Sequence, residues 1–238
     1  MRILGIDSSG LVVSVAVVED DRLLAEYTVN YKKTHSQTLL PMLDEIVRMT
    51  ELDLKTIDAI AVAAGPGSFT GLRIGSATAK GLGLALGTPL IAVPTVEALA
   101  YNLWGTDKRI CPLMDARRNQ VYTGIYAFYG EEMQTLEGQM AVGVEELAQK
   151  LNRMGREVIF LGDGVPVYRD LLEQCVTVKH SYAPAHLNKQ RAGAVAALGM
   201  IYARQGKLQT AAEHQPDYLR LSQAERERAE KKAEKAHD

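Results

Sequence analysis

Apolar segments separated by short polar joints fill the first 30 residues of the chain. Arg2–Asp7, residues 12–18 and Arg22–Val29 are rich in Val, Ile and Leu, and the joints between them contain Ser, Gly, Glu and Asp. Apolar runs bounded by turn-forming residues are typical of strands. We therefore expect three strands joined by short turns, which form an antiparallel meander.

Helical spacing begins after this meander, near Thr34. The apolar residues recur at i, i+1, i+4, i+7 and i+8, which places them on one helix face: Leu39, Leu40, Leu43, Ile46 and Val47. Residues 59–64 then predict a strand, residues up to about Gly87 a second helix, and residues 89–93 another strand. This order of elements predicts a mixed sheet with helices on its faces.

The second half, from about Asp107, repeats this layout loosely. It predicts strands at residues 111–115, Gln120–Tyr129 and 157–161, and helices at Val144–Met154, residues 165–173 and Ala192–Arg204. Asp7 and Asp115 each end the first strand of their half and lead into a turn and another strand. This is an internal repeat of layout without sequence identity.

The predicted domains are residues 1–105, with the partner-binding helices, and residues 106–221. A charged tail follows at residues 222–238, composed almost entirely of Ala, Glu, Lys and Arg. Such a tail forms a solvated helix through Glu/Lys pairs or stays disordered.

Charge and cysteine usage narrow the class of protein. The net charge of −2 over 238 residues provides no global basic field for nucleic acid. Cys111 and Cys175 lie far apart, which argues against a disulfide framework or a cysteine zinc site. No apolar run approaches about 18 residues, and Asp7 interrupts the first apolar segment, so we expect no membrane span and no signal peptide. The chain reads as a cytoplasmic protein.

The most informative segment is the glycine-rich turn that starts at Gly65-Pro66-Gly67. It lies between a predicted strand and a predicted helix, an arrangement that presents backbone N–H groups to anions. Its G-x-G-x-x-x-G spacing matches neither the dinucleotide fingerprint nor a P-loop. A structural turn is the favoured interpretation, and a phosphate cradle is the alternative.

Small residues recur every four positions along the helix after this turn: Gly71, Gly75, Ala79, Gly83 and Gly87. Glycine inside a helix costs roughly 0.5–1 kcal/mol relative to alanine, so these glycines need a structural reason. Close approach of another backbone is the usual one. The ridge then packs on the sheet of its own chain, or also on a helix of a second protein.

His35 is the best isolated titratable candidate, because it lies at the start of the first predicted helix. A histidine there can exchange a proton near neutral pH, but the favoured interpretation is a polar cap in which Thr34 or Ser36 supplies the oxygen. The other histidines have no metal-ligand spacing: His180, His186, His214 and His237. The chain has no H-E-x-x-H motif and no recognisable nucleophile, so we expect no peptidase activity.

The layout resembles the actin/Hsp70/sugar-kinase superfamily, whose duplicated domains each begin with a strand, an Asp, a turn and a strand that meet phosphates. More closely, the chain resembles the TsaB family, bacterial partner proteins for threonylcarbamoyladenosine formation on tRNA. The matching segments are residues 4–9, 35–41, 65–73, 114–118 and 216–220. The resemblance implies an α/β fold of two tandem ribonuclease H-like domains, each a mixed sheet with flanking helices.

The resemblance also implies a non-catalytic scaffold that dimerises with the catalytic paralogue TsaD. That assembly transfers a threonylcarbamoyl group from an adenylate to N6 of the adenosine beside the anticodon of ANN-decoding tRNAs. The ATPase TsaE is recruited to the assembly, tRNA is contacted only indirectly, and a homodimer is expected when the partner is missing. The expected partner-binding residues are Leu39, Leu43, Phe69, Gly71, Leu72, Gly75, Ala79 and Gly83.

In TsaD, two histidines four residues apart on a helix bind a metal. The matching positions of this chain are Thr95 and Leu99. Leucine cannot ligate a metal, and threonine is a poor neutral ligand. The comparison therefore implies the fold of an enzyme without its metal site, and we expect neither a metal nor a catalytic residue.

A degenerate nucleotide cleft is expected at six residues: Asp7, Ser8, Asp115, Arg118, Gly162 and Gly164. The carboxylates of Asp7 and Asp115 suit a hydrated Mg²⁺. The second phosphate loop, glycine-rich in active members of the superfamily, reads Ala-Arg-Arg-Asn at residues 116–119, so closure on a nucleotide is hindered. We expect no cofactor in this chain, and ATP only in the assembled complex. The alternative function is a stand-alone ATP-dependent phosphotransferase of the sugar-kinase type.

Overall fold

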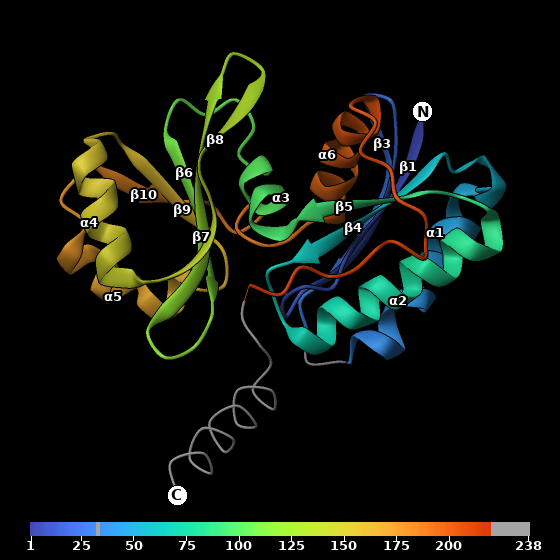
Figure 1. Cartoon of the computed structure of the whole chain (residues 1–238), viewed down its shortest axis with the longest axis horizontal. Coiled ribbons are helices and arrows are strands. Elements are labelled where there is room, and N and C mark those ends of the chain that lie inside the picture. The colour runs from blue at the N-terminus through green and yellow to red at the C-terminus, as the bar shows by residue number, and fades with distance from the viewer. Residues whose placement is uncertain (32–33, 220–238) are drawn as a thin grey trace, which may run out of the picture.

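The computed structural model describes residues 1–31 and 34–219, which form two lobes side by side (Figure 1). The predicted tail at residues 222–238 lies outside the described residues. The elements of the first half are β1 (Arg2–Asp7), β2 (Val13–Glu19), β3 (Arg22–Val29), α1 (His35–Thr50), a 3₁₀ turn (Leu54–Thr56), β4 (Ala59–Gly65), α2 (Phe69–Leu86), β5 (Leu90–Pro94) and α3 (Thr95–Tyr101). Those of the second half are β6 (Arg109–Asp115), β7 (Gln120–Tyr129), β8 (Glu132–Gly143), α4 (Val144–Met154), β9 (Val158–Leu161), α5 (Val165–Cys175), β10 (His180–Tyr182) and α6 (Ala192–Arg204).

The two sheets have the same topology. Their strand orders are β3-β2-β1-β4-β5 and β8-β7-β6-β9-β10, so each half pairs its third, second, first, fourth and fifth strands in turn. In each sheet the first three strands pair antiparallel and the last two join in parallel. The predicted internal repeat and the predicted fold class of two tandem mixed sheets are confirmed.

The boundary predicted at residue 106 separates the two sheets, but it does not separate the two lobes. α6 crosses back from the second half and packs on β1, β2, β4 and β5 of the first sheet (Figure 1). The contact is close, because a Cβ on Gly5 of β1 would lie 2.3 Å from the carbonyl oxygen of Ala192 in α6. The first lobe is therefore built from both ends of the described chain.

Successive side chains of β1 point to opposite faces of the first sheet, and helices cover both faces. Leu4 and Ile6 face α1 and α2, whereas Ile3 faces α6. α3 packs on the first sheet and also against β6 and β7, so it forms the joint between the lobes. In the second lobe, α4 and α5 cover the other face of the sheet.

Four elements were missed by the pattern of the sequence: the 3₁₀ turn at Leu54–Thr56, α3, β8 and β10. Along α1 the predicted apolar face is also shifted. Leu39, Leu43 and Ile46 are buried as expected, but Leu40 is 53% exposed and Met42 is buried instead. The face that points into the core therefore follows the i, i+3, i+4 spacing from Leu39, and Leu40 is left on the outside.

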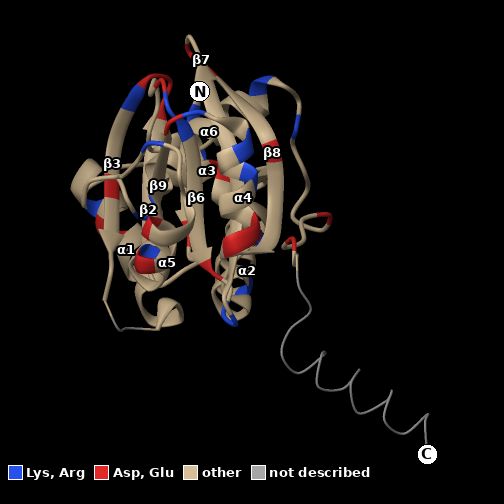
Figure 2. Cartoon of the chain, turned by 90° about the vertical axis from the view of Figure 1, so that its left-hand side faces the viewer, with Lys and Arg blue, Asp and Glu red and all other residues tan. Residues whose placement is uncertain are grey.

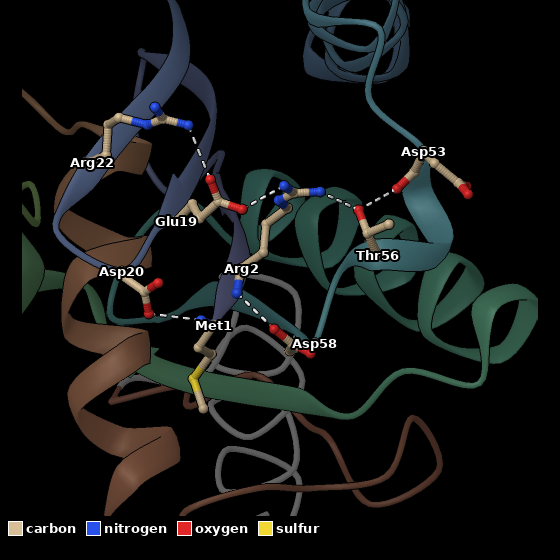
Figure 3. A network of polar contacts seen from close by, with 8 residues as sticks. All are labelled: Met1, Arg2, Glu19, Asp20, Arg22, Asp53, Thr56 and Asp58. Carbon is tan, nitrogen blue, oxygen red and sulfur yellow. Dashed lines mark hydrogen bonds and ion pairs between the residues drawn. The ribbon is translucent and has the colours of Figure 1, made fainter.

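Polar contacts fix one end of the first sheet (Figure 3). The guanidinium of Arg2 donates to the carboxylate of Glu19 on β2 and to the hydroxyl of Thr56 in the 3₁₀ turn. The backbone N–H of Arg2 donates to Asp58 at 2.7 Å. These bonds join β1 to the neighbouring strand and to the segment that leads into β4.

The small-residue ridge of α2 faces its own sheet. A Cβ on Gly71 would lie 2.0 Å from the carbonyl oxygen of Ser8, and one on Gly75 would lie 2.5 Å from the Ser8 hydroxyl oxygen. Gly83 approaches a methyl carbon of Leu90 in the same way, at 2.4 Å, and Ala79 is fully buried. The ridge is thus explained within the chain, where it lets α2 lie directly on the turn after β1.

Gly81 lies on the opposite face of α2, and a Cβ there would meet nothing within 4 Å. Because the site is open and helical, Gly81→Ala is expected to raise the free energy of unfolding by roughly 0.5–1 kcal/mol. Gly75→Ala is the matched variant on the inner face, and it is expected to lower the same quantity because its methyl group meets Ser8. Urea denaturation of both variants measures the difference, and equal effects would contradict the orientation of the helix.

Candidate functional site

A cleft of about 490 Å³ lies between the lobes, where the turn after β1, the glycine-rich turn and the end of β6 meet. Its lining comes from both halves of the chain and from the segment after α6. The lining residues include Ser9, Gly10, Pro66, Gly67, Phe69, Asp115, Arg117, Asp163, Asp217, Tyr218 and Leu219.

Asp7 lies beneath the cleft and does not line it. Its side chain is 1% exposed, and its carboxylate accepts hydrogen bonds from the Ser9 hydroxyl at 2.6 Å and the Ser9 backbone N–H at 2.9 Å. Burial raises the pKa of Asp7 to about 6, although the two bonds from Ser9 lower it. A carboxylate held this way organises the turn of residues 8–10.

Ser8 and His35 fix the same turn from two sides. The hydroxyl of Ser8 donates to the carbonyl of Gly71 at 2.8 Å, so Ser8 ties the turn to α2. The Nε2 of His35 lies 2.8 Å from the carbonyl oxygen of Gly10, a contact that the Nε2–H tautomer makes as donor. Among the described residues, neither Thr34 nor Ser36 supplies a capping oxygen to α1, so the expected cap from these two residues is wrong. The start of α1 lies beside Gly10 in the folded chain, so His35 holds the turn of residues 8–10 in place.

The second carboxylate, Asp115, lines the cleft but is already engaged. It accepts from the Tyr168 hydroxyl at 2.9 Å and from the backbone N–H of Arg117 at 2.8 Å, and the Arg117 guanidinium lies 3.4 Å away. Asp163, which the sequence did not single out, also lines the cleft, and burial raises its pKa. The cleft therefore presents acidic groups whose bonds are largely satisfied within the chain.

The loop after Asp115 has an unusual backbone. Arg117, Arg118 and Asn119 have φ values of 63°, 56° and 57°, in the left-handed region that favours glycine. The side chains of these residues were expected to hinder closure on a nucleotide. Their backbone conformations are ones that glycine adopts more readily. Arg118 is exposed and lines a neighbouring surface pocket rather than the cleft.

Gly162 and Gly164 do not line the cleft. Gly162 has φ 107°, and a Cβ on it would lie 2.1 Å from the carbonyl oxygen of Leu113. Gly164 approaches the same oxygen at 3.0 Å. Both glycines let the turn before α5 pack on β6. Among the six residues expected for a nucleotide cleft, Asp115 alone is in its lining.

The glycine-rich turn is used for close packing of backbones. A Cβ on Gly67 would lie 2.4 Å from the carbonyl oxygen of Ser9, and one on Gly65 would lie 2.1 Å from the carbonyl oxygen of Asp217. Ser68 caps α2 by accepting from the N–H of Gly71. This geometry supports the structural turn over the phosphate cradle.

The eight expected partner-binding residues are mostly internal. Leu39, Leu43 and Leu72 belong to the core, as does the ridge from Gly71 to Gly83, and Phe69 alone retains partial exposure. The outer surface of the same two helices includes other residues: Leu40 on α1 and Arg73, Ala77, Gly81, Leu84 and Ala85 on α2. Leu84 is 74% exposed.

Thr95 and Leu99, at the positions of the histidine pair in TsaD, are buried in α3. The hydroxyl of Thr95 accepts from the N–H of Gly65 at 3.2 Å, and Leu99 packs in the joint between the lobes. Within residues 1–31 and 34–219, no group of three or more His, Cys, Asp or Glu side chains is placed to hold a metal ion. The helices in this part of the chain are also too short or too polar to cross a membrane.

Comparisons with known proteins agree with this geometry. The model of the TsaD family, described as tRNA N6-adenosine threonylcarbamoyltransferase, matches residues 22–228. The tRNA threonylcarbamoyladenosine biosynthesis protein TsaB of Bacillus subtilis is 34% identical over 94% of this chain and 96% of its own length. TsaB of Escherichia coli is 32% identical over 72% of this chain and 75% of its own length. Among solved structures, YeaZ from Pseudomonas aeruginosa is 27% identical with a TM-score of 0.79, and the match covers 92% of this chain and 99% of that one.

The fold and the family model together define a two-lobed α/β protein related to the TsaD family of tRNA N6-adenosine threonylcarbamoyltransferases. Within that class, the chain belongs to the TsaB family of tRNA threonylcarbamoyladenosine biosynthesis proteins. The resemblance noted from the sequence segments is thus confirmed, and so is its link to tRNA modification.

The buried carboxylate gives a pH-dependent prediction. The pKa of Asp7 is about 6 in the folded chain and 3.8 ordinarily, so ionisation of this carboxyl group disfavours the folded state. The free energy of unfolding of the wild type is therefore expected to fall as pH rises from about 4 to 6. Asp7→Asn removes this ionisation. Relative to the wild type, its free energy of unfolding is expected to rise across that window by up to about 3 kcal/mol. Urea denaturation from pH 4 to 7 measures the difference, and a difference independent of pH would contradict it.

Proposed function

We propose that this chain is a non-catalytic activating subunit, which dimerises with a TsaD-family enzyme for N6-threonylcarbamoyl transfer to the adenosine beside the anticodon of ANN-decoding tRNAs. The observation that carries the proposal is the outer face of α2. Gly81 lowers the stability of an exposed helix, yet no contact within the described chain requires it. A partner backbone that approaches this face supplies the missing reason.

Leu40 near the start of α1 and Leu84 near the end of α2 are exposed leucines on the same two helices. Both are more than half exposed, and the two helices pack against each other on the same side of the first sheet (Figure 1). Exposed leucines beside small residues suit the packing of helices from another protein. The partner surface of the proposal is therefore Leu40, Arg73, Ala77, Gly81, Leu84 and Ala85, in place of the inner ridge.

The non-catalytic part of the proposal is supported by the state of the cleft. Asp115 is held by Tyr168 and Arg117, and the turn after β6 is occupied by arginines in left-handed conformations. Thr95 and Leu99 serve the core at the positions of the metal-binding histidines. The chain then carries no cofactor of its own, and ATP is held only in the assembled complex.

The remaining partners follow from the same proposal. TsaE joins through the TsaD-containing complex, and tRNA is contacted indirectly in the cytoplasm. In the view of Figure 2, Lys/Arg and Asp/Glu positions are intermixed along the ribbon of the described residues. An RNA backbone is bound best by clustered Lys and Arg. A homodimer through the outer α1/α2 face is the proposed state of the isolated chain.

Leu84→Glu tests the partner surface. A charge in the centre of a helix interface is expected to weaken the complex with TsaD of the same organism by at least about thirtyfold, the scale of a central interface residue. Tyr129→Glu on β7 is the matched control, because Tyr129 is 52% exposed, lies on the other lobe and does not line the cleft. Light scattering after gel filtration measures complex formation, with thermal unfolding of each variant alone as a check on folding. An intact complex for Leu84→Glu would overturn the proposed surface.

The rival function is a stand-alone ATP-dependent phosphotransferase. Under our proposal the isolated chain shows no ATP binding by calorimetry and no threonylcarbamoyl transfer, and it raises the transfer rate of TsaD when both are mixed. Saturable ATP binding by the isolated chain, lost in Asp7→Ala, would favour the phosphotransferase instead.

A further inference from the structure

The segment after α6, residues 208–219, returns across the first lobe. Gln209 pairs with Leu90 of β5 through two backbone hydrogen bonds of 2.8 Å. Further along, the ammonium group of Lys80 on α2 donates to the carbonyl of His214 at 2.9 Å, and His214 is fully buried. The segment is therefore anchored along α2 and at the edge of the first sheet.

Its last described residues sit on the glycine-rich turn. The N–H of Asp217 donates to the carbonyl of Ala64 at 2.7 Å. The carbonyl oxygen of Asp217 takes the space in which a Cβ on Gly65 would lie, and Gly65 has φ 129°, which glycine alone adopts readily. The glycine-rich turn, for which a phosphate cradle was the alternative interpretation, is thus covered by a backbone carbonyl of the chain itself.

An aromatic and cationic stack holds this end of the segment. The rings of Tyr218 and Phe69 lie 4.9 Å apart, and the guanidinium of Arg73 lies 3.9 Å from the centre of the Phe69 ring. Arg73 also donates to the Tyr218 hydroxyl at 3.3 Å. From the second lobe, the side-chain amide of Gln139 on β8 donates to the Asp217 carboxylate.

We propose that residues 208–219 are an autoinhibitory strap, which covers the glycine-rich turn and forms one wall of the cleft between the lobes. Asp217, Tyr218 and Leu219 form one wall of the cleft, and Asp217 adds a carboxylate to Asp115 and Asp163. An anionic ligand such as a nucleotide phosphate is then kept from the backbone of the glycine-rich turn, and it is repelled by the carboxylates in the cleft. Release of the Tyr218 stack withdraws the wall and the carboxylate together, and it exposes the backbone at Gly65–Gly67.

Hydrogen exchange tests whether Tyr218 holds the strap. In Tyr218→Ala, the amides of Gln209 and Asp217 are expected to exchange about tenfold faster, because the loss of an aromatic pair shifts a local opening equilibrium on that scale. Tyr129→Ala is the matched control, since Tyr129 is 52% exposed on β7 of the second lobe. Unchanged exchange in Tyr218→Ala, with α6 still protected, would overturn the proposal.

Thiol labelling tests whether the strap limits access to the cleft. Met114 lines the cleft and is 3% exposed, so Met114→Cys in a Cys175→Ser background places a reporter in the wall. Its reaction with a disulfide reagent is expected to be about tenfold faster when Tyr218→Ala is added, and unchanged with Tyr129→Ala. Equal rates in all three proteins would show that the strap does not gate the cleft. Neither measurement involves TsaD, so both are independent of the proposed partner.

Discussion

The close approach of α2 to the turn after β1 is the contact on which the first lobe depends. Gly71 and Gly75 bring the helix against Ser8, whose hydroxyl donates to the carbonyl of Gly71. The same turn is held by Asp7 from below and by His35 from α1. One short turn thus fixes a strand and two helices, and it does so through backbone contacts that no larger residue on α2 would permit.

This arrangement has a consequence for the cleft. In a fold with two such turns facing each other, backbone N–H groups are available to phosphates only if the turns are uncovered. In this chain the first turn is tied to α2 and the glycine-rich turn is covered by Asp217. The second turn contains Arg117 and Arg118 in left-handed conformations. The polar groups of the cleft are satisfied mainly by the protein, which accords with a chain that works through a partner.

α2 connects the cleft to the outer surface. Its first turn carries Phe69 and Arg73, which hold Tyr218 at the cleft, while Gly81 and Leu84 farther along face solvent. Arg73 is exposed on the same helix face as Gly81.

Residue patterns by themselves determined most elements and the repeated layout, because the period of apolar residues is set by local geometry: Arg22–Val29, Val144–Met154 and Ala192–Arg204 agree at both ends. The glycines of α2 also predicted that this helix packs closely against another backbone. Only the tertiary structure decided which face of α2 is inside, since a glycine ridge is compatible with either a sheet or a partner. It also decided that α6 and residues 208–219 belong with the first lobe, because packing between residues far apart in the chain leaves no periodic signal.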